Sequence, residues 1–315
     1  MAIFLTEDDV RRFISIEQAI EEVEQAFKEH GDGTAINSSR ERVQAGKAGV
    51  TMMVAALGGR GVCGFKTMSA GKPMVSLYGG EPYQLLAVLE AGTLGQIRTG
   101  AASGVATRHM SNRNASSVGV IGTGFQAMTQ LAAICAVRPI KKALAYSRTE
   151  SRREQFCTKM SDVLGIQVSP AASAADAILG VDIIITITNV RTIDPVLFGD
   201  WLQPGVHINA AGANSLGRRE LDDNAIARCS IIAADSTDQA KLECADLSIA
   251  IESGLLTWDS VLNLGQIVTG RSPGRINEND ITLFESQGIA LEDVAVAAHI
   301  FERAKADGAG KPLPF

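Results

Sequence analysis

The chain has 315 residues, of which 46% are hydrophobic and 20% charged, and its formal net charge is −6. This composition excludes a disordered chain and provides apolar mass for one large core or two ordinary ones. A mildly acidic chain without a basic run is a poor nucleic-acid binder, so we expect no nucleic-acid partner. The sequence has no stretch of eighteen apolar residues, so we expect no membrane span.

The N-terminus and the cysteines favour a cytoplasmic protein. The opening apolar run turns acidic after five residues and is too short for a signal peptide. The five cysteines are widely spaced and form no CxxC pair. This pattern is typical of thiols in a reducing compartment rather than of a disulfide framework or a zinc site. We therefore expect a cytoplasmic chain without a bound metal.

The first third of the chain predicts a helix followed by a sheet. Ser15 and Gln18 form a capping-box pattern, apolar residues recur after it at helical spacing, and Gly31 can end the helix. Short apolar runs between glycine-rich breaks predict strands at 50–57, 62–68 and 85–89. The stretch 69–80 looks short and irregular. The Ala- and Gly-rich segment that begins at Gly95 predicts a helix lying tightly against other backbone.

From residue 114 onward, apolar strands alternate with helices, which predicts a parallel sheet covered on both faces. The strands are expected at 116–121, 142–146, 166–168, 182–188, 206–212 and 230–236. The helices between the first of these strands are expected at 126–137, 149–160 and 174–180. A last helix, 291–306, has an apolar face and lies beyond the final strand, so it can return to the first domain.

The fold class that these patterns predict is α/β, with a Rossmann-type doubly wound parallel sheet and a smaller α+β domain. The Rossmann-type domain is expected at 114–286. The smaller domain is expected to combine 1–113 with 287–315, so that both ends of the chain contribute to it.

A glycine-rich turn marks a dinucleotide site. The segment Gly122-Thr123-Gly124-Phe125-Gln126-Ala127 follows a predicted strand and opens a predicted helix, and further βα units follow it. In this context the first glycine permits the tight turn, the second lets a pyrophosphate approach the backbone, and the alanine allows close helix–strand packing. The N-terminus of the helix then offers free N–H groups to the phosphates.

The end of the second strand of this domain favours NADP(H) over NAD(H). NAD sites usually place a carboxylate there to hold the ribose 2′-hydroxyl. This chain instead has Ser147, Arg148 and Thr149, followed by Arg152 and Arg153. Hydroxyls beside guanidinium groups suit a 2′-phosphate, although such arginines can equally form the solvated face of a helix. NAD(H) stays possible.

Six segments together resemble the ornithine cyclodeaminase/mu-crystallin family. They occur in the family's order and cover nearly the whole chain. The segments are MVAA at 53–56, GFKT at 64–67, GQIRTGAAS at 95–103, GTGFQA at 122–127, HINAAG at 207–212 and RELD at 219–222. The most specific feature is the RTGAAS block, followed some twenty residues later by the glycine turn.

The resemblance implies a two-domain homodimer in which the smaller domain binds the substrate and the partner copy. Members reduce cyclic imines or ketimines, interconvert amino and keto acids, or cyclise ornithine to proline with loss of ammonia. All three reactions pass a hydride between a substrate carbon and a nicotinamide. A small carboxylated amine or imine is therefore the expected substrate.

The resemblance also implies residues that handle the substrate. Arg98 matches the arginine that binds the substrate carboxylate, a group that its fork suits. Lys66 matches the lysine beside the substrate nitrogen, where a buried lysine can exchange a proton. Arg40 matches an early arginine that contacts substrate, although Arg42 fits the same loose alignment. Each of the three could instead form a structural ion pair.

Further cofactor contacts follow from the same resemblance. They are Thr99, Thr186, Ile187, Thr188, Ala211 and Ser286. Asp235 also ends a predicted strand, where it can either face the cofactor or cap the following helix. His207 lies inside a predicted core strand, and we interpret it as structural.

One departure from the family bears on the reaction. Cyclodeaminases carry an Asp, thought to act as a base, at the position that matches Asn214, and an amide cannot take up a proton at neutral pH. We therefore expect an NADP(H)-dependent reductase of a carboxylated imine, or an amino acid dehydrogenase, in which Lys66 or water supplies the proton. A true ornithine cyclodeaminase is the enzymatic alternative. A non-catalytic NADPH-dependent binding protein is the alternative from another class.

Overall fold

The computed structural model describes residues 1–69 and 71–314 and divides the chain into two compact units. Unit 1 consists of Met1–Ala101 and Gly288–Phe315, and unit 2 consists of Ala102–Gln287. The first division lies inside a helix, α3 (Gly92–Met110), rather than at residue 113. Among the described residues, no helix combines the length and the apolar character that crossing a membrane requires.

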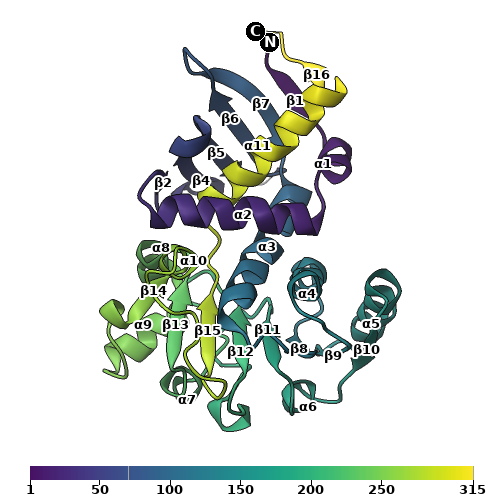
Figure 1. Cartoon of the computed structure of the whole chain (residues 1–315), viewed down its shortest axis with the longest axis vertical. Coiled ribbons are helices and arrows are strands. Elements are labelled where there is room, and N and C mark those ends of the chain that lie inside the picture. Colours follow the sequence, from purple (N-terminus) through teal and green to yellow (C-terminus); the bar gives the residue numbers. More distant parts are fainter. Residues whose placement is uncertain (70, 315) are drawn as a thin grey trace. The chain divides into compact units, whose positions relative to one another are not determined.

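Unit 1 is built on an eight-stranded sheet in the order β16-β1-β7-β6-β5-β4-β2, with β3 paired to β4 (Figure 1). The strands are β1 (Ile3–Leu5), β2 (Ala35–Asn37), β3 (Glu41–Ala45), β4 (Ala48–Leu57), β5 (Val62–Met68), β6 (Met74–Gly79), β7 (Gln84–Glu90) and β16 (Lys311–Pro312). β1 pairs with β16, so the two ends of the chain lie side by side.

Helices cover one face of this sheet. α11 (Ala290–Asp307) crosses β4, β5 and β6, and α2 (Ile16–Gly31) packs against α11 (Figure 1). The expected apolar face of α11 is buried, at Val294, Ala298, Phe301 and Ala304. The C-terminal helix therefore packs on strands from the first third of the chain.

The other face of the sheet presents apolar side chains to solvent. Along β4, Met53, Ala55 and Leu57 are buried, while Val50, Met52 and Val54 alternate with them and are each about 40% exposed. Such alternation follows from the period of two in a strand. Five exposed apolar side chains gather on β2, β3 and β4, here named the outer face: Ile36, Val43, Val50, Met52 and Val54.

The interpretation of 69–80 as irregular was wrong for most of that stretch. Residues 74–79 form β6, which pairs with β5 and β7 in the middle of the sheet. The strand is only six residues long and lies between Pro73 and Gly80, which hides its alternation of buried Val75 and Leu77 with half-buried neighbours. Ala70 lies outside the described residues.

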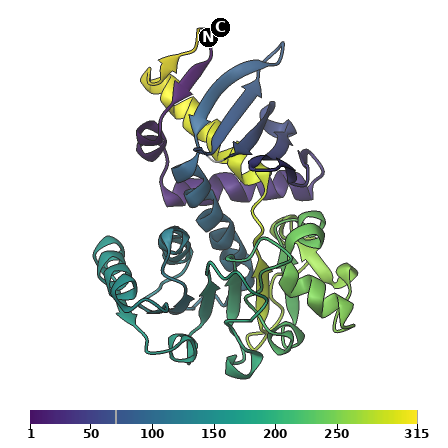
Figure 2. The ribbon, with the colours of Figure 1, turned by 180° about the vertical axis from the view of Figure 1, so that it is seen from behind.

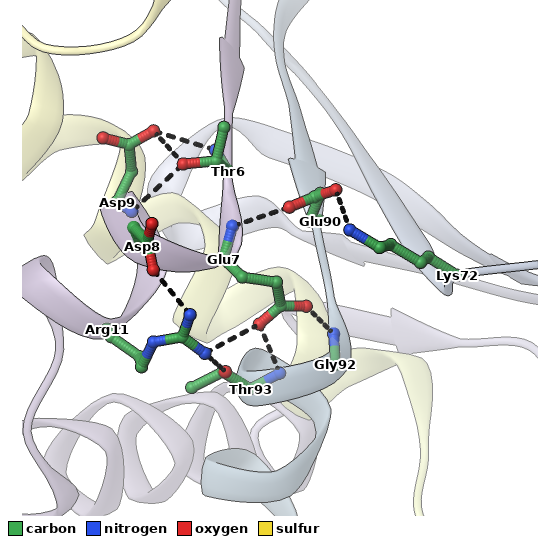
Figure 3. Close-up of polar contacts among 9 residues, drawn as sticks. All are labelled: Thr6, Glu7, Asp8, Asp9, Arg11, Lys72, Glu90, Gly92 and Thr93. Carbon is green, nitrogen blue, oxygen red and sulfur yellow. Dashed lines mark hydrogen bonds and ion pairs between the residues drawn. The ribbon is translucent and has the colours of Figure 1, made fainter.

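Two carboxylates join the starts of α1 (Glu7–Phe13) and α3 in unit 1 (Figure 3). The Glu7 side chain accepts hydrogen bonds from the backbone N–H groups of Gly92, at 2.6 Å, and Thr93, at 2.9 Å. Glu90 accepts one from the Glu7 N–H at 2.8 Å and pairs with Lys72 at 2.8 Å. These bonds satisfy helix N–H groups that have no partner within a helix.

Unit 2 is built on an eight-stranded, all-parallel sheet in the order β10-β9-β8-β11-β12-β15-β13-β14. The strands are β8 (Ser117–Ile121), β9 (Lys142–Tyr146), β10 (Gln167–Pro170), β11 (Ile183–Thr186), β12 (His207–Ala210), β13 (Ile231–Ala234), β14 (Val261–Asn263) and β15 (Thr282–Glu285). The predicted α/β class with a doubly wound parallel sheet is thereby confirmed. β14 and β15 had no counterpart in the sequence prediction.

Seven helices of unit 2 follow these strands and cover the sheet (Figure 2). They are α4 (Phe125–Val137), α5 (Glu150–Leu164), α6 (Ala174–Ile178), α7 (Asp223–Ala227), α8 (Thr237–Glu243), α9 (Ala245–Glu252) and α10 (Leu264–Val268). Successive residues of β11 point to two separate cores: Ile183 and Ile185 belong to one, and Ile184 to the other. A strand buried on both faces explains its continuous apolar sequence.

Candidate functional site

The glycine turn after β8 has the geometry that its residues predict. Gly122 has a φ of +111°, and a Cβ on it would lie 2.3 Å from the Ile187 carbonyl oxygen, so no other residue fits. Gly124 precedes α4, and within the described chain no atom lies within 4 Å of the Cβ it lacks. Ala127 is fully buried against the sheet. The start of α4 therefore leaves open space beside N–H groups, which fits a pyrophosphate.

At the end of β9, some of the polar side chains make contacts within the protein and others are exposed to solvent. The hydroxyls of Ser147 and Thr123 lie 2.7 Å apart, which joins this strand end to the glycine turn. Arg153 donates to the Ser147 carbonyl at 2.9 Å and lies over the Tyr146 ring, so its guanidinium helps to hold the strand end. Arg148 is exposed. Thr149 and Arg152 are exposed as well, at the start of α5.

Glu220 joins the ends of β11 and β12, a role that the sequence reasoning missed. Its carboxylate accepts hydrogen bonds from the Thr186 hydroxyl at 2.9 Å, the Thr188 N–H at 2.7 Å and hydroxyl at 2.6 Å, and the Gly212 N–H at 2.8 Å. Burial raises the pKa of this carboxyl, and the four bonds oppose that rise. Thr186 is fully buried, so its hydroxyl shapes the carboxyl edge of the sheet from within.

A second buried carboxyl supports Glu220. Asp246 Oδ1 accepts the backbone N–H groups of Glu220, at 3.0 Å, and Leu221, at 2.6 Å. Burial raises the pKa of Asp246 to about 7. Cys244 and Glu285 place their ligand atoms within 4.8 Å of those of Asp246, a grouping that no sequence spacing reveals. Burial also raises the pKa of both Cys244 and Glu285, which favours their neutral forms.

The remaining residues expected near the cofactor lie at strand ends of unit 2. Ala211 follows β12, and Ser286 follows β15 with its hydroxyl buried and without a hydrogen-bond partner among the described residues. An orphaned hydroxyl at a strand end fits a polar ligand there. Asp235 is not the cap of α8, because the N-cap is Ser236, whose hydroxyl accepts the Gln239 N–H.

Two other side chains of unit 2 bear on the chemistry. Asn214 is exposed in the loop after β12. His207 is fully buried on β12, with Nδ1 2.9 Å from the Thr282 hydroxyl, and burial lowers its pKa to about 3. A ring that stays neutral in a strand interior agrees with a structural role.

In unit 1 the structure gathers the three expected cations. Lys66 on β5 and Arg98 on α3 both contact Asp293 Oδ1, at 2.9 Å and 3.0 Å. Arg40 precedes β3 and donates to the Gly288 carbonyl at 2.6 Å. All three are buried, whereas Arg42, the alternative to Arg40, is exposed on β3.

Two carboxylates of α11 complete this group. Glu292 Oε2 lies 2.6 Å from Arg98 Nη1, and the side chains of Glu292 and Asp293 are at most 1% exposed. Arg98 is thus in a buried ion pair, the structural alternative that the sequence left open. Arg98 thus contacts both carboxylates and Lys66 contacts one of them, so buried cations and anions lie together in unit 1.

Two glycines give the cations room. A Cβ on Gly95 would lie 2.8 Å from Lys66 Nζ, so the ammonium rests against the backbone of α3. A Cβ on Gly288, whose φ is +75°, would lie 2.6 Å from Arg98 Nη1. The Thr99 hydroxyl donates to the Gly95 carbonyl at 2.7 Å, one turn earlier in α3. Gly95, the first residue of the GQIRTGAAS segment, therefore leaves the space that the Lys66 ammonium occupies.

Comparisons with known proteins identify the family of the chain. The model of the ornithine cyclodeaminase/mu-crystallin family matches residues 1–308. The chain belongs to this family. The resemblance drawn from the six sequence segments is therefore confirmed.

Reductases and dehydrogenases are among the relatives of this family member. It is 39% identical over 253 residues to a Δ1-pyrroline-2-carboxylate reductase of Bacillus cereus, which covers 80% of this chain and 76% of that protein. The structure of the Thermococcus litoralis Δ1-pyrroline-2-carboxylate reductase with NADH and L-proline matches with a TM-score of 0.93 at 32% identity, covering 99% of this chain and 100% of the other. An archaeal alanine dehydrogenase dimer with bound NAD matches with a TM-score of 0.92 at 30% identity, covering 100% and 99%.

Proposed function

We propose that this chain reduces a small cyclic imine carboxylate to the corresponding amino acid, with Δ1-pyrroline-2-carboxylate as the first candidate. The chain is an NAD(P)-dependent oxidoreductase acting on C–N bonds, as its family and its relatives indicate. The observation that carries the narrower proposal is the burial of Lys66, Arg98 and Arg40 close to one another in unit 1. Guanidinium groups suit the carboxylate of such a substrate, and an ammonium group suits its nitrogen as a proton donor.

The chain's own residues would bind the substrate and move one proton. Arg98 and Arg40 hold the carboxylate, since guanidinium groups form directed, charge-assisted hydrogen bonds. Lys66 delivers a proton from Nζ to the imine nitrogen. The bound nucleotide supplies the hydride for the imine carbon. Burial of the cations strengthens their pull on the substrate, because little water screens them.

Asn214 separates this proposal from ornithine cyclodeamination. The amide takes up no proton at neutral pH, and the reduction of a preformed imine needs no base at that position. The test incubates the purified chain with Δ1-pyrroline-2-carboxylate and NADPH or NADH, and separately with ornithine. We expect one nucleotide oxidised per proline formed. Ammonia release from ornithine at constant nucleotide absorbance would contradict the proposal, and tight NADPH binding without turnover of any imine would favour a carrier.

The strand end after β9 supports a preference for NADP(H). Ser147 and the exposed Arg148 and Arg152 offer a hydroxyl and two cations to a 2′-phosphate, whereas Arg153 holds the backbone. Replacing both Arg148 and Arg152 by Ala should weaken NADPH binding by about tenfold or more and leave NADH binding unchanged. Calorimetric titration of both nucleotides measures this. Equal losses for the two nucleotides would assign the arginines to another task.

The outer face supports a homodimer. Its exposed valine, isoleucine and methionine side chains form an apolar sheet surface of the kind that protein interfaces cover. The occupant that we propose is a second copy of this chain, since the related archaeal alanine dehydrogenase is described as a dimer. An isologous contact would pair the same strands of the two copies.

A further inference from the structure

Asp293 is the negative charge that touches both Lys66 and Arg98. Its Oδ1 lies 2.9 Å from Lys66 Nζ and 3.0 Å from Arg98 Nε. Its Oδ2 is buried and has no hydrogen-bond partner among residues 1–69 and 71–314. A carboxylate that is 1% exposed and half-satisfied is costly unless the charges beside it or the reaction require it.

We infer that Asp293 is a positioning residue that holds the proton on Lys66 and fixes the ammonium in place for delivery to the substrate nitrogen. The inference rests on the proposed reduction of an imine. The N–H bond formed at the substrate is matched by the N–H bond broken at Lys66, and the hydride brings the electron pair for the new C–H bond. Solvent then returns a proton to the neutral amine of Lys66.

The charges around Lys66 act in opposite directions. Burial lowers the pKa of Lys66, and Arg98 on α3 and Arg40 before β3 lower it further, whereas Asp293 on α11 raises it. Glu292, also on α11, contacts Arg98 Nη1 at 2.6 Å. Without Asp293, the ammonium form of Lys66 would lose the carboxylate that it contacts, while Arg98 and Arg40 would still lower its pKa.

The two carboxylates of α11 are therefore matched test positions. Asp293→Asn keeps the shape of the side chain and removes the negative charge that lies beside the Lys66 ammonium. Glu292→Gln removes a charge of the same sign from the preceding residue, whose carboxylate contacts Arg98 at 2.6 Å. The first substitution should change the proton affinity of Lys66 far more than the second.

The decisive experiment titrates the Lys66 side chain by NMR in protein carrying ¹³C-labelled lysine, with the signal assigned from Lys66→Arg. Asp293→Asn should lower the midpoint by about one to three pH units. Glu292→Gln should shift it much less. Asp293→Glu should restore it towards the wild-type value. Should Asn at 293 prevent folding, Arg98→Gln provides the opposite test, because removing that cation should raise the midpoint.

Imine reduction supplies a second, independent readout. The alkaline fall of kcat should move to lower pH in Asp293→Asn, by the shift that NMR records, and should stay in place in Glu292→Gln. An unchanged Lys66 midpoint in Asp293→Asn overturns the inference. If Asp293→Asn lowers the Lys66 midpoint but the wild-type protein turns over no imine, the effect of Asp293 on Lys66 is supported and the proposed function is contradicted.

Discussion

Gly95 shows how a single missing methyl group can matter to a cation. Lys66 Nζ occupies the space beside the Gly95 Cα, and the same ammonium donates a hydrogen bond to Asp293. Because the lysine is buried, an added Cβ moves a group that has little room to relax. The identity of residue 95 is thus tied to the position of a reactive nitrogen.

Gly95→Ala should therefore separate stability from activity. Alanine is the better helix former by about 1 kcal/mol, so the substitution should not lower the free energy of unfolding by much. The displaced ammonium should reduce kcat for imine reduction by about tenfold to a hundredfold. Denaturant melts and steady-state rates measure the two quantities. The control is Gly217→Ala, at an exposed loop position where the nearest atom lies 3.9 Å from the added Cβ. Equal values of kcat in the two variants would show that Gly95 does not set the position of the Lys66 ammonium.

At the residue scale, the cations could be predicted and their partners could not. Lys66 and Arg98 lie in short motifs that identify the family, so local sequence is enough to find them. Asp293 is 227 residues from Lys66 and 195 residues from Arg98 along the chain. Its sequence environment is only an acidic pair in the first turns of a helix, which more often indicates favourable helix electrostatics than a site.

At the element scale, α3 carries Arg98 and depends on a carboxylate from another helix. Glu7 accepts the N–H groups of Gly92 and Thr93 (Figure 3). Hydrogen bonds from Thr93 and Gly92 outweigh burial and lower the pKa of Glu7. A lowered folded pKa means that this group stabilises the fold above its unfolded pKa, and the contribution is lost as pH falls through the folded pKa.

Glu7→Gln should lower the free energy of unfolding by about 1 kcal/mol at neutral pH. The difference from wild type should shrink as the pH falls below the pKa of Glu7, because the wild-type carboxyl is then neutral too. Urea unfolding across acid pH measures the difference, with the exposed Glu154→Gln on α5 as the control. A constant difference at every pH would show that charge plays no part in this cap.

Glu220 plays the corresponding role in unit 2, where one side chain satisfies groups after β11 and after β12. Glu220→Ala would leave the half-buried N–H groups of Thr188 and Gly212 without their acceptor. We expect a loss of about 3 kcal/mol in the free energy of unfolding, with weaker nucleotide binding in the fraction that folds. Denaturant melts and NADPH titration measure both. If the variant is destabilised but binds NADPH with wild-type affinity, the hydrogen bonds to Glu220 stabilise the fold without shaping the cofactor site.

Helices and strands could be predicted from the sequence where their apolar patterns were long enough. The strands of unit 2 up to β13 and the helices α4, α5 and α6 follow clear apolar runs, and so were predicted from the sequence, whereas the five-residue α7 was not. β6 and β14 are short, and their identity as strands comes from pairing with neighbours rather than from their own residues. The end of α3 is likewise fixed by distant groups, since Arg138 donates to carbonyls at that end of the helix.

At the scale of the whole molecule, we expect the outer face to form the contact between two copies of the chain. Met52→Glu combined with Val54→Glu places two charges on exposed positions of β4, next to buried residues that stay unchanged. Light scattering should report a dimer for wild type and a monomer for the variant, because burying unpaired carboxylates is costly. The matching substitutions Glu154→Gln and Lys159→Gln on α5 should leave the dimer intact. A variant that remains dimeric would place the contact elsewhere.

The central claim is that a hydride from a pyridine nucleotide reaches the imine carbon of a carboxylated substrate. The most direct measurement supplies NADPH that carries deuterium at the transferable position, together with Δ1-pyrroline-2-carboxylate, and analyses the product by mass spectrometry and NMR. The account predicts proline with one deuterium on its α-carbon for each nucleotide oxidised. Unlabelled proline, or nucleotide oxidation without any amino acid product, would contradict it.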